Sequence, residues 1–183
     1  LMLAFISSVD NMDKLEQIRK DNLIRAGIIE GSTKTKKVGI VWLSYNVHGN
    51  EANSTEAAMK TLHALADKSN IKTQEWLKNT VVIIDPSVNP DGRDRYANWY
   101  RMTANRWPDA DPLGREHMEP WPGGRTNHYY FDLNRDWAWQ TQIESQLRIV
   151  KYNEWLPHIH VDFHEQGYNS PYFFAPAAKP LHQ

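Results

Sequence analysis

The sequence predicts an α/β fold in three layers (α/β/α), with helices on both faces of a mixed, largely parallel sheet. Two apolar runs, residues 38–43 and 80–84, show no alternation of polar and apolar side chains, as expected for strands buried on both faces. Segments with helical spacing separate these runs, which is the order of a parallel sheet with crossover helices. A chain of 183 residues that is 40% hydrophobic is long enough to bury one substantial core.

The first elements follow from local signals. Residues 1–6 are apolar and predict a short strand. Residues 11–26 predict a helix, with Asp10 as its N-cap and Gly27 just beyond its end. Residues 31–37 are polar and predict a loop that leads into the first buried strand.

The next helix is predicted over residues 54–67, where apolar side chains recur every three or four positions. They are Ala58, Met59, Leu62, Leu65 and Ala66. Residues 71–78 predict a second, short helix before the strand at 80–84.

The second half of the chain begins with turn chemistry. Asn89-Pro90-Asp91-Gly92 predicts a turn, and residues 93–130, which contain four prolines, predict an irregular segment. Such a long irregular segment is expected to have a function, such as covering a site. Helical spacing returns over residues 141–154, Pro157 ends that helix, and residues 158–164 predict the next strand.

Three side chains suited to a metal lie at or just beyond strand ends. His48 and Glu51 follow the strand at 38–43, and His164 closes the strand at 158–164. Ligands of parallel sheets collect beyond the carboxyl ends of the strands. Two imidazoles and one carboxylate match a catalytic zinc ion that keeps one position open.

Other interpretations of these side chains remain open. Glu51 is also the acid expected in the first turn of a helix, and His164 could be a core histidine with a hydrogen-bond partner. His158 and His160 could form a separate metal pair on the polar face of the same strand.

Composition excludes several classes of protein. The net charge of -1 gives no reason to expect nucleic acid as a partner. No apolar stretch approaches the roughly 20 residues of a membrane span. The chain has no cysteine, which excludes disulfides and thiolate metal sites. Its first residues lack the basic start and cleavage site of a signal peptide.

A series of motifs in order makes the chain resemble the zinc carboxypeptidases of the carboxypeptidase A-like family. The motifs are His48-Gly-Asn-Glu51, Asn89-Pro-Asp-Gly92, the block from Gly124-Arg125 to Asp132-Leu-Asn134-Arg135-Asp136, and His164. They span about residues 38–175 and are most similar to the carboxypeptidase E- and N-like branch.

This resemblance implies a role for each matching residue. One zinc ion would be held by His48, Glu51 and His164, and Asp132 would orient His48. The C-terminal carboxylate of a peptide or protein would be bound by Asn134 and Arg135, for which the planar guanidinium is suited. Arg125 would polarise the scissile carbonyl. Arg101 and Arg106 are the alternatives for that last role, and a surface location is the alternative for Arg125 and Arg135.

The chain departs from the family in one important respect. The family's general base is a glutamate well downstream of the third zinc ligand, and this chain stops at Gln183, nineteen residues after His164. Residues 1–183 are therefore expected to be the N-terminal part of a longer catalytic domain that lacks its general base. Glu165 is a poor substitute, because neighbours on a strand point to opposite faces. A smaller departure is Trp137, where the family usually has Phe.

The function that the resemblance implies is hydrolysis of a C-terminal peptide bond by a zinc-dependent carboxypeptidase. Two alternatives remain: a related zinc amide hydrolase that acts on N-acyl amino acids or cell-wall peptides, and a non-catalytic peptide-binding module. The resemblance also implies a secreted or periplasmic protein.

Overall fold

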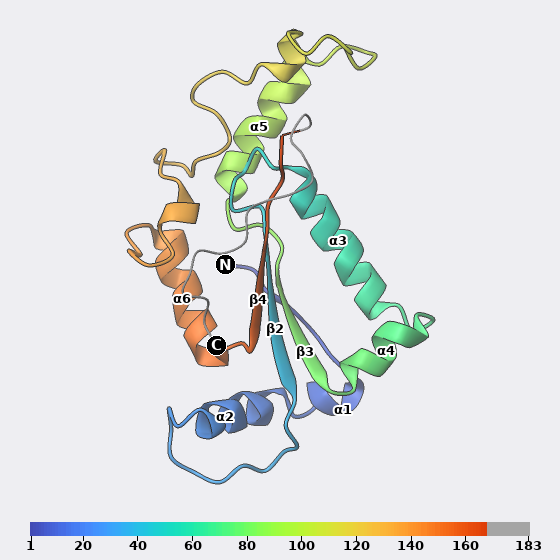
Figure 1. Ribbon diagram of the computed structural model, residues 1–183, viewed down its shortest axis with the longest axis vertical. Helices are drawn as coiled ribbons and strands as arrows, with labels where there is room; N and C mark the ends of the chain where they lie inside the picture. The colour runs from blue at the N-terminus through green and yellow to red at the C-terminus, as the bar shows by residue number, and fades with distance from the viewer. Residues whose placement is uncertain (168–183) are drawn as a thin grey trace, which may run out of the picture.

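A four-stranded sheet forms the centre of the computed structural model, which describes residues 1–167. Its strands are β1 (Ala4–Ile6), β2 (Gly39–Tyr45), β3 (Thr80–Asp85) and β4 (Ile159–Phe163). They lie in the order β1-β3-β2-β4 (Figure 1). β2 is parallel to both β3 and β4, and β1 is antiparallel to β3. The sheet is therefore mixed and largely parallel, as predicted.

Helices cover both faces of this sheet (Figure 1). They are α1 (Val9–Met12), α2 (Leu15–Arg25), α3 (Asn53–Ala66), α4 (Ile71–Leu77), α5 (Pro90–Thr103) and α6 (Ile143–Trp155). Two short 3₁₀ helices are η1 (Arg115–His117) and η2 (Leu133–Arg135). Among the described residues, no helix has the length and apolar character needed to cross a membrane.

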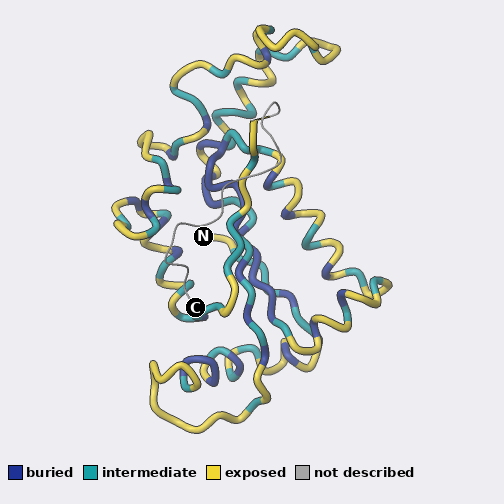
Figure 2. The backbone as a smooth tube through the Cα atoms, viewed as in Figure 1, coloured by how far each residue is buried: buried dark blue, intermediate teal, exposed yellow. Residues whose placement is uncertain are grey.

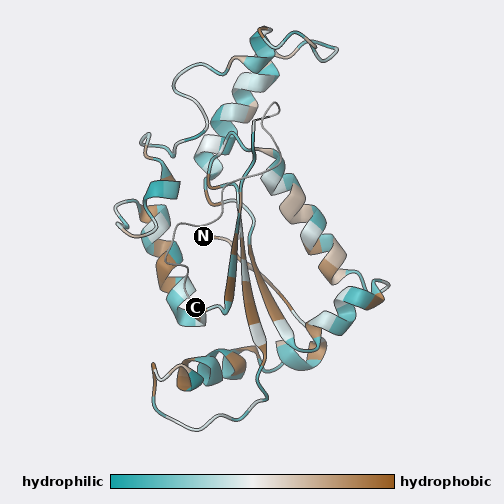
Figure 3. Ribbon diagram, viewed as in Figure 1, coloured by the Kyte–Doolittle hydropathy of each residue, from teal (hydrophilic) through white to brown (hydrophobic). Residues whose placement is uncertain are grey.

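Two separate apolar cores explain the three layers. The side chains of β2 and β3 alternate between them, so both strands are dark blue and teal in the burial view and largely brown in the hydropathy view (Figures 2 and 3). Towards α3 and α4 the core contains Ile6, Tyr45, Ala58, Leu65, Leu77, Val82 and Ile84. Towards α2 and α6 it contains Ile18, Val38, Ile40, Trp42, Val81, Ile83 and Trp155. The predicted three-layer fold is confirmed.

The prediction of a single helix over residues 11–26 is wrong. The chain forms α1 and α2, which are separated at Asp13 and Lys14, and Ser8 rather than Asp10 is the N-cap of α1. The side chain of Asn11 is buried and donates to the carbonyl oxygen of Leu77 at 3.1 Å. This contact fixes α1 beside α4, whereas α2 packs on the opposite core, so tertiary contacts override the local helical signal.

The turn predicted at Asn89–Gly92 is instead the start of α5. The side chain of Asn89 accepts a hydrogen bond from the Gly92 amide at 2.9 Å, and Pro90 occupies the first turn, where its missing N–H costs nothing. Residues 93–103, predicted as irregular, therefore continue as helix. The rest of that segment is irregular apart from η1. The assignment of residues 1–183 to one domain stays a prediction, and part of that range lies outside the described residues.

Candidate metal centre

The loop between β2 and α3 is folded around one buried side chain, Asn46. Its backbone is left-handed, with φ of 61°, a conformation that asparagine tolerates better than most residues. Its Nδ2 donates to the carbonyl oxygens of His48, Gly49 and Glu51 at 2.8, 3.3 and 3.0 Å. These hydrogen bonds tie the loop around the Asn46 amide and hold the backbone at both His48 and Glu51.

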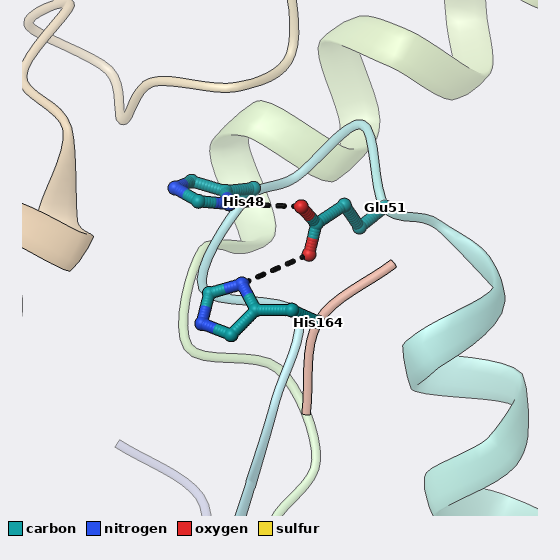
Figure 4. A group of neighbouring side chains, drawn as sticks. All are labelled: His48, Glu51 and His164. Atoms are coloured by element: carbon teal, nitrogen blue, oxygen red, sulfur yellow. Dashed lines mark hydrogen bonds and ion pairs between the residues drawn. The ribbon is translucent and has the colours of Figure 1, made fainter. Parts of the chain in front are cut away.

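His164 meets this loop from the end of β4 (Figure 4). Nδ1 of His48 lies 2.9 Å from Oε1 of Glu51, and Nδ1 of His164 lies 3.2 Å from Oε2 of the same carboxylate. One ligand atom from each residue can be chosen so that all three lie within 4.8 Å of one another. The structure thus brings the His48–Glu51 pair together with His164, which lies 113 residues after Glu51 in the chain.

Each histidine has a second carboxylate on its other ring nitrogen. Nε2 of His48 lies 3.1 Å from Oδ1 of Asp132, and Nε2 of His164 lies 3.3 Å from Oδ2 of Asp162. When Nε2–H donates to its carboxylate, the Nδ1 lone pair is directed at Glu51, which is the tautomer that can bind a metal; in the other tautomer Nδ1–H donates to Glu51. In the metal-binding tautomer, two lone pairs and one carboxylate form an electron-rich group that a divalent cation would stabilise. The donor set therefore fits a zinc ion.

The carboxylates of this site favour their charged forms. Burial by itself would raise the pKa of Glu51, but the hydrogen bonds from His48 and the Glu165 amide, with the charges of His48 and His164, lower it. Burial likewise opposes the charge of Asp132, and His48, the Asn134 amide and Arg125 lower its pKa. Deprotonated carboxylates are the form that binds metal.

Arg125 is attached to the metal-ligand cluster through Asp132. Its Nε and Nη2 lie 3.1 and 2.9 Å from Oδ2 of Asp132. Within residues 1–167, no hydrogen bond involves its Nη1, and half of its side chain is exposed. Arg106, an alternative for the same role, lies against the ring of Trp107. Arg101, the other alternative, is in the last turn of α5.

Asn134 and Arg135 lie in η2, directly after Asp132. The backbone amide of Asn134 donates to Oδ1 of Asp132 at 2.9 Å, so η2 begins at the carboxylate that contacts His48. Arg135 is exposed, and its Nη1 donates to the carbonyl oxygen of Asn134 at 3.2 Å. Both residues thus follow closely after Asp132, which contacts the metal-ligand cluster, and the guanidinium of Arg135 is exposed.

Three glycines bring the site loops into backbone contact. A Cβ on Gly49 would lie 2.2 Å from the Arg93 nitrogen, and one on Gly92 would lie 2.3 Å from the Gly124 carbonyl oxygen. Asn89 fastens the same junction, because its Nδ2 donates to the carbonyl oxygens of Val47 and Arg125 at 3.3 and 3.2 Å. Neither the turn signal of Asn89–Gly92 nor its resemblance to a family motif indicates this role.

The remaining candidates have other contacts. The backbone amide of Glu165 donates to Oε2 of Glu51 at 3.1 Å. Burial raises the pKa of its carboxyl group, and the nearby amides of Asn53 and Ser54 oppose the rise, which places that group against the start of α3. His158 accepts a hydrogen bond from the Ile40 amide at 3.1 Å, and His160 lies 2.9 Å from the Ser44 hydroxyl. These partners favour a structural role over a second metal pair.

One sizeable cavity lies away from this cluster. It has a volume of about 620 Å³ and lies at the other end of the sheet, where α1 and the loop before β2 meet. The chemistry of the donor atoms, rather than cavity size, therefore identifies the site.

A model of the zinc carboxypeptidase family matches residues 14–154. This range includes His48, Glu51, Arg125 and the segment from Asp132 to Arg135, and it ends before His164. The approach of His164 to Glu51 is thus independent of the match. A search of curated proteins finds no match. The greater similarity to the carboxypeptidase E- and N-like branch stays a prediction. Because the match covers most of its length, the chain belongs to the zinc carboxypeptidase family.

Proposed function

We propose that this chain is the zinc-binding part of a metallocarboxypeptidase that hydrolyses the C-terminal peptide bond of peptides or proteins. The observation that carries the proposal is the convergence of His48 and His164, each through Nδ1, on the two oxygens of Glu51. In a member of the zinc carboxypeptidase family, this arrangement supports one Zn²⁺ held by these three side chains.

The bound zinc would supply Lewis-acid activation of the scissile carbonyl and a water of lowered pKa. The chain's own residues do the rest. Asp132 and Asp162 hold the two imidazoles in the tautomer that binds metal. Arg125, fixed to Asp132 through Nε and Nη2, presents Nη1 to the carbonyl oxygen and stabilises the negative charge that develops there.

Asn134 and Arg135 make the reaction an exopeptidase reaction. They bind a free carboxylate, for which the arginine fork offers two parallel hydrogen bonds. Asn134 and Arg135 follow Asp132 closely, so they lie near the metal-ligand cluster. Only the last residue of a peptide can therefore place its carboxylate at Asn134 and Arg135 while the carbonyl of the scissile bond reaches the cluster. A glutamate as general base and a secreted or periplasmic location are also parts of the proposal.

The first test is zinc binding, measured as metal content after dialysis and as affinity in competition with a chromophoric chelator. We expect one zinc per chain in the wild type and none in His48→Ala. The matched control is His63→Ala, an exposed histidine of α3, which should keep its zinc. Stoichiometric zinc in His48→Ala would contradict the assignment.

The second test is recognition of the peptide terminus. Calorimetry on the zinc-loaded protein should show that hippuryl dipeptides with a free carboxylate bind at least about tenfold more tightly than their amides. Arg135→Lys should weaken this preference and leave the zinc content unchanged. Tighter binding of N-acyl amino acids would favour the amide hydrolase instead. Zinc binding with no turnover by the full-length protein would favour the peptide-binding module.

A further inference from the structure

The cavity of about 620 Å³ at the far end of the sheet is built from separate parts of the chain. Its walls come from α1 and the residues on either side of it, from α2, from residues 34–38 and from the residue that follows α4. Figure 1 shows α1, α2 and the loop that leads into β2 gathered at the end of the sheet opposite α5. Pockets that hold small molecules usually have a volume of about 300–1,000 Å³. The size of this cavity is therefore that of a small-molecule site.

Lysine side chains make this cavity electropositive. Its lining contains one carboxylate, that of Asp10, and the four lysines Lys14, Lys34, Lys36 and Lys78. Lys78 is paired with Glu75, which lies outside the lining. Within residues 1–167, the other three lysines have no carboxylate partner for their ammonium groups. An anion in the cavity would therefore meet positive charge that the protein does not neutralise itself.

The backbone that carries these lysines is held in place. Nζ of Lys36 donates to the carbonyl oxygen of Lys78 at 3.0 Å and to Oδ1 of Asn79 at 2.9 Å. Both acceptors are uncharged, so they fix the ammonium group without cancelling its charge. The buried carboxylate of Asp21 accepts hydrogen bonds from the backbone amides of Lys34 and of the residue after it, at 2.8 and 2.6 Å. A site that is already ordered loses less entropy when it binds a ligand.

Asn11 and Ser8 add uncharged polar atoms to the lining. Asn11 is only 5% exposed, and its Nδ2 donates to the carbonyl oxygens of Leu77 and Lys78 at 3.1 and 3.3 Å. Carbonyl oxygens only accept, so these contacts fix the orientation of the amide, and its Oδ1 has no hydrogen-bond partner among the described residues. The Ser8 hydroxyl does not cap α1. Hydroxyl groups on a ligand could donate to Oδ1 of Asn11 and form a hydrogen bond with Ser8.

The deepest part of the lining is apolar. Ile18 and Val38 are 2% and 3% exposed, whereas the lysines are exposed. Apolar walls with a few polar groups are typical of sites for organic molecules. A carbon skeleton can pack on Ile18 and Val38 while its charged groups reach the ammonium groups, which a hydrated inorganic ion cannot do.

We propose that this cavity binds a small organic anion that carries several negative charges together with hydroxyl groups. Sugar bisphosphates and hydroxylated polycarboxylates share this chemistry. The site is separate from the metal-ligand cluster, and it requires neither zinc nor the proposed peptidase activity. Its occupation stabilises the folded chain, because the unfolded chain does not assemble the cavity.

The first experiment is calorimetric binding of fructose 1,6-bisphosphate and of citrate in a buffer of low ionic strength. We expect one site per chain and a dissociation constant below about 1 mM for at least one of the two anions. The anion that binds more tightly identifies the class of ligand. Uncharged fructose, the reference, should show no binding.

Variants then test whether the lysines of the cavity are responsible. Lys14→Gln combined with Lys34→Gln should weaken anion binding at least about fivefold, because two ion pairs with the ligand are lost. The matched control is Lys60→Gln combined with Lys68→Gln, which removes the same charge from exposed positions outside the cavity. Its affinity should stay within about twofold of the wild type, because solvent and salt screen distant charges.

The Ser8 hydroxyl is tested with two anions that differ by one group. Citrate has a hydroxyl group that tricarballylate lacks. Ser8→Ala should therefore weaken the binding of citrate more than that of tricarballylate. Because Ser8 makes no capping hydrogen bond, the variant should keep the stability of the wild type. Equal losses for both ligands would overturn the assignment of hydroxyl recognition.

Three results would overturn the proposed anion site. One is no binding of either anion to the wild type. Another is an equal effect of the two double lysine variants, which would indicate general attraction by charge or heat from removal of zinc by the ligand. The third is tighter binding of a hexaglutamate peptide than of both anions, which would make the occupant an acidic peptide. The zinc content of the protein tests the proposed function separately from all three.

Discussion

Oδ1 of Asp132 lies 3.1 Å from Nε2 of His48. The other oxygen of this carboxylate holds the guanidinium of Arg125, and Oδ1 also accepts the Asn134 amide. One side chain therefore fixes a proposed metal ligand, the proposed carbonyl-binding arginine and the start of η2. A change at Asp132 should affect metal binding and substrate binding together.

Asp132→Ala should lower the zinc affinity by roughly 10- to 100-fold, because His48 loses the partner that fixes its tautomer. Asp132→Asn should lose less zinc affinity, since the amide oxygen of the new side chain can still accept a hydrogen bond from Nε2 of His48. Competition with a chromophoric chelator measures both. Asp94→Ala, an exposed aspartate of α5, is the control. Wild-type affinity in Asp132→Ala would argue against this carboxylate acting on the metal site.

Gly49→Ala should destabilise the protein by about 3 kcal/mol or more, because its new Cβ would overlap backbone atoms that cannot move independently. Gly39→Ala is the matched control. Its Cβ would meet its nearest neighbour, the Asn79 carbonyl oxygen, at an ordinary 3.6 Å. Urea unfolding of the two variants gives the difference in free energy of unfolding. Similar values for both would show that the three-glycine junction can relax.

Asn46→Gly separates backbone conformation from hydrogen bonding in the loop before α3. Glycine adopts the left-handed conformation freely, but it cannot donate to the three carbonyl oxygens that Asn46 binds. We expect a loss of about 2 kcal/mol in unfolding free energy and a weaker zinc site, because His48 and Glu51 are less well ordered. Asn46→Ala should lose more unfolding free energy than the glycine variant, since alanine is strained in the left-handed conformation of this position. If the glycine variant matched the wild type in both measurements, the amide would have no organising role.

Arg148→Met should cost about 3–5 kcal/mol, because it leaves the carboxylate of Asp85 buried without its partner. Burial already raises the pKa of Asp85 above its usual 3.8, although the charge of Arg148 opposes the rise. Without Arg148 the pKa rises further. A folded state with a raised carboxyl pKa binds a proton that the unfolded state has released, so stability falls as pH rises through that window.

The penalty of Arg148→Met relative to the wild type should therefore be smaller near pH 5 than near pH 7. Urea unfolding at both pH values measures it. In the double variant Asp85→Asn with Arg148→Met, the loss of unfolding free energy relative to the wild type should vary less with pH. An equal penalty at both pH values in the single variant would mean that Asp85 keeps its charge without the guanidinium.

The elements with strong local signals were predictable. The apolar runs at β2 and β3 identify strands buried on both faces, and α3, α4 and α6 lie within two residues of their predicted ranges. The break between α1 and α2 was not predictable, because it depends on Asn11 reaching a carbonyl oxygen 66 residues away. The start of α5 carried a usable signal, an N-capping asparagine before a proline, which the turn preference of the same residues obscured.

Some residues of the candidate site were predictable from local spacing and one was missed. His48 and Glu51 are close in the chain and follow a clear strand, so local spacing was enough to identify them. The partner of His164 was missed, although Asp162 belongs to the polar face that His158 and His160 indicated. Asp162 lies two residues before His164, so the period of two along the strand was a signal that could have identified it.

The junction at Gly49, Gly92 and Gly124 has a consequence for how this protein can vary. The chain leaves the body of the fold after Gly92, through α5 and the irregular segment that follows it, and returns at Gly124 (Figure 1). The backbones of Gly92 and Gly124 are held against each other and act as the two anchor points of this projection. Insertions or deletions before Glu119, whose carboxylate accepts from the Gly124 amide and from Nδ2 of Asn50, would change the size of that projection without shifting either anchor point. The architecture thus offers a place where new surface can be added while the arrangement of the imidazoles stays intact.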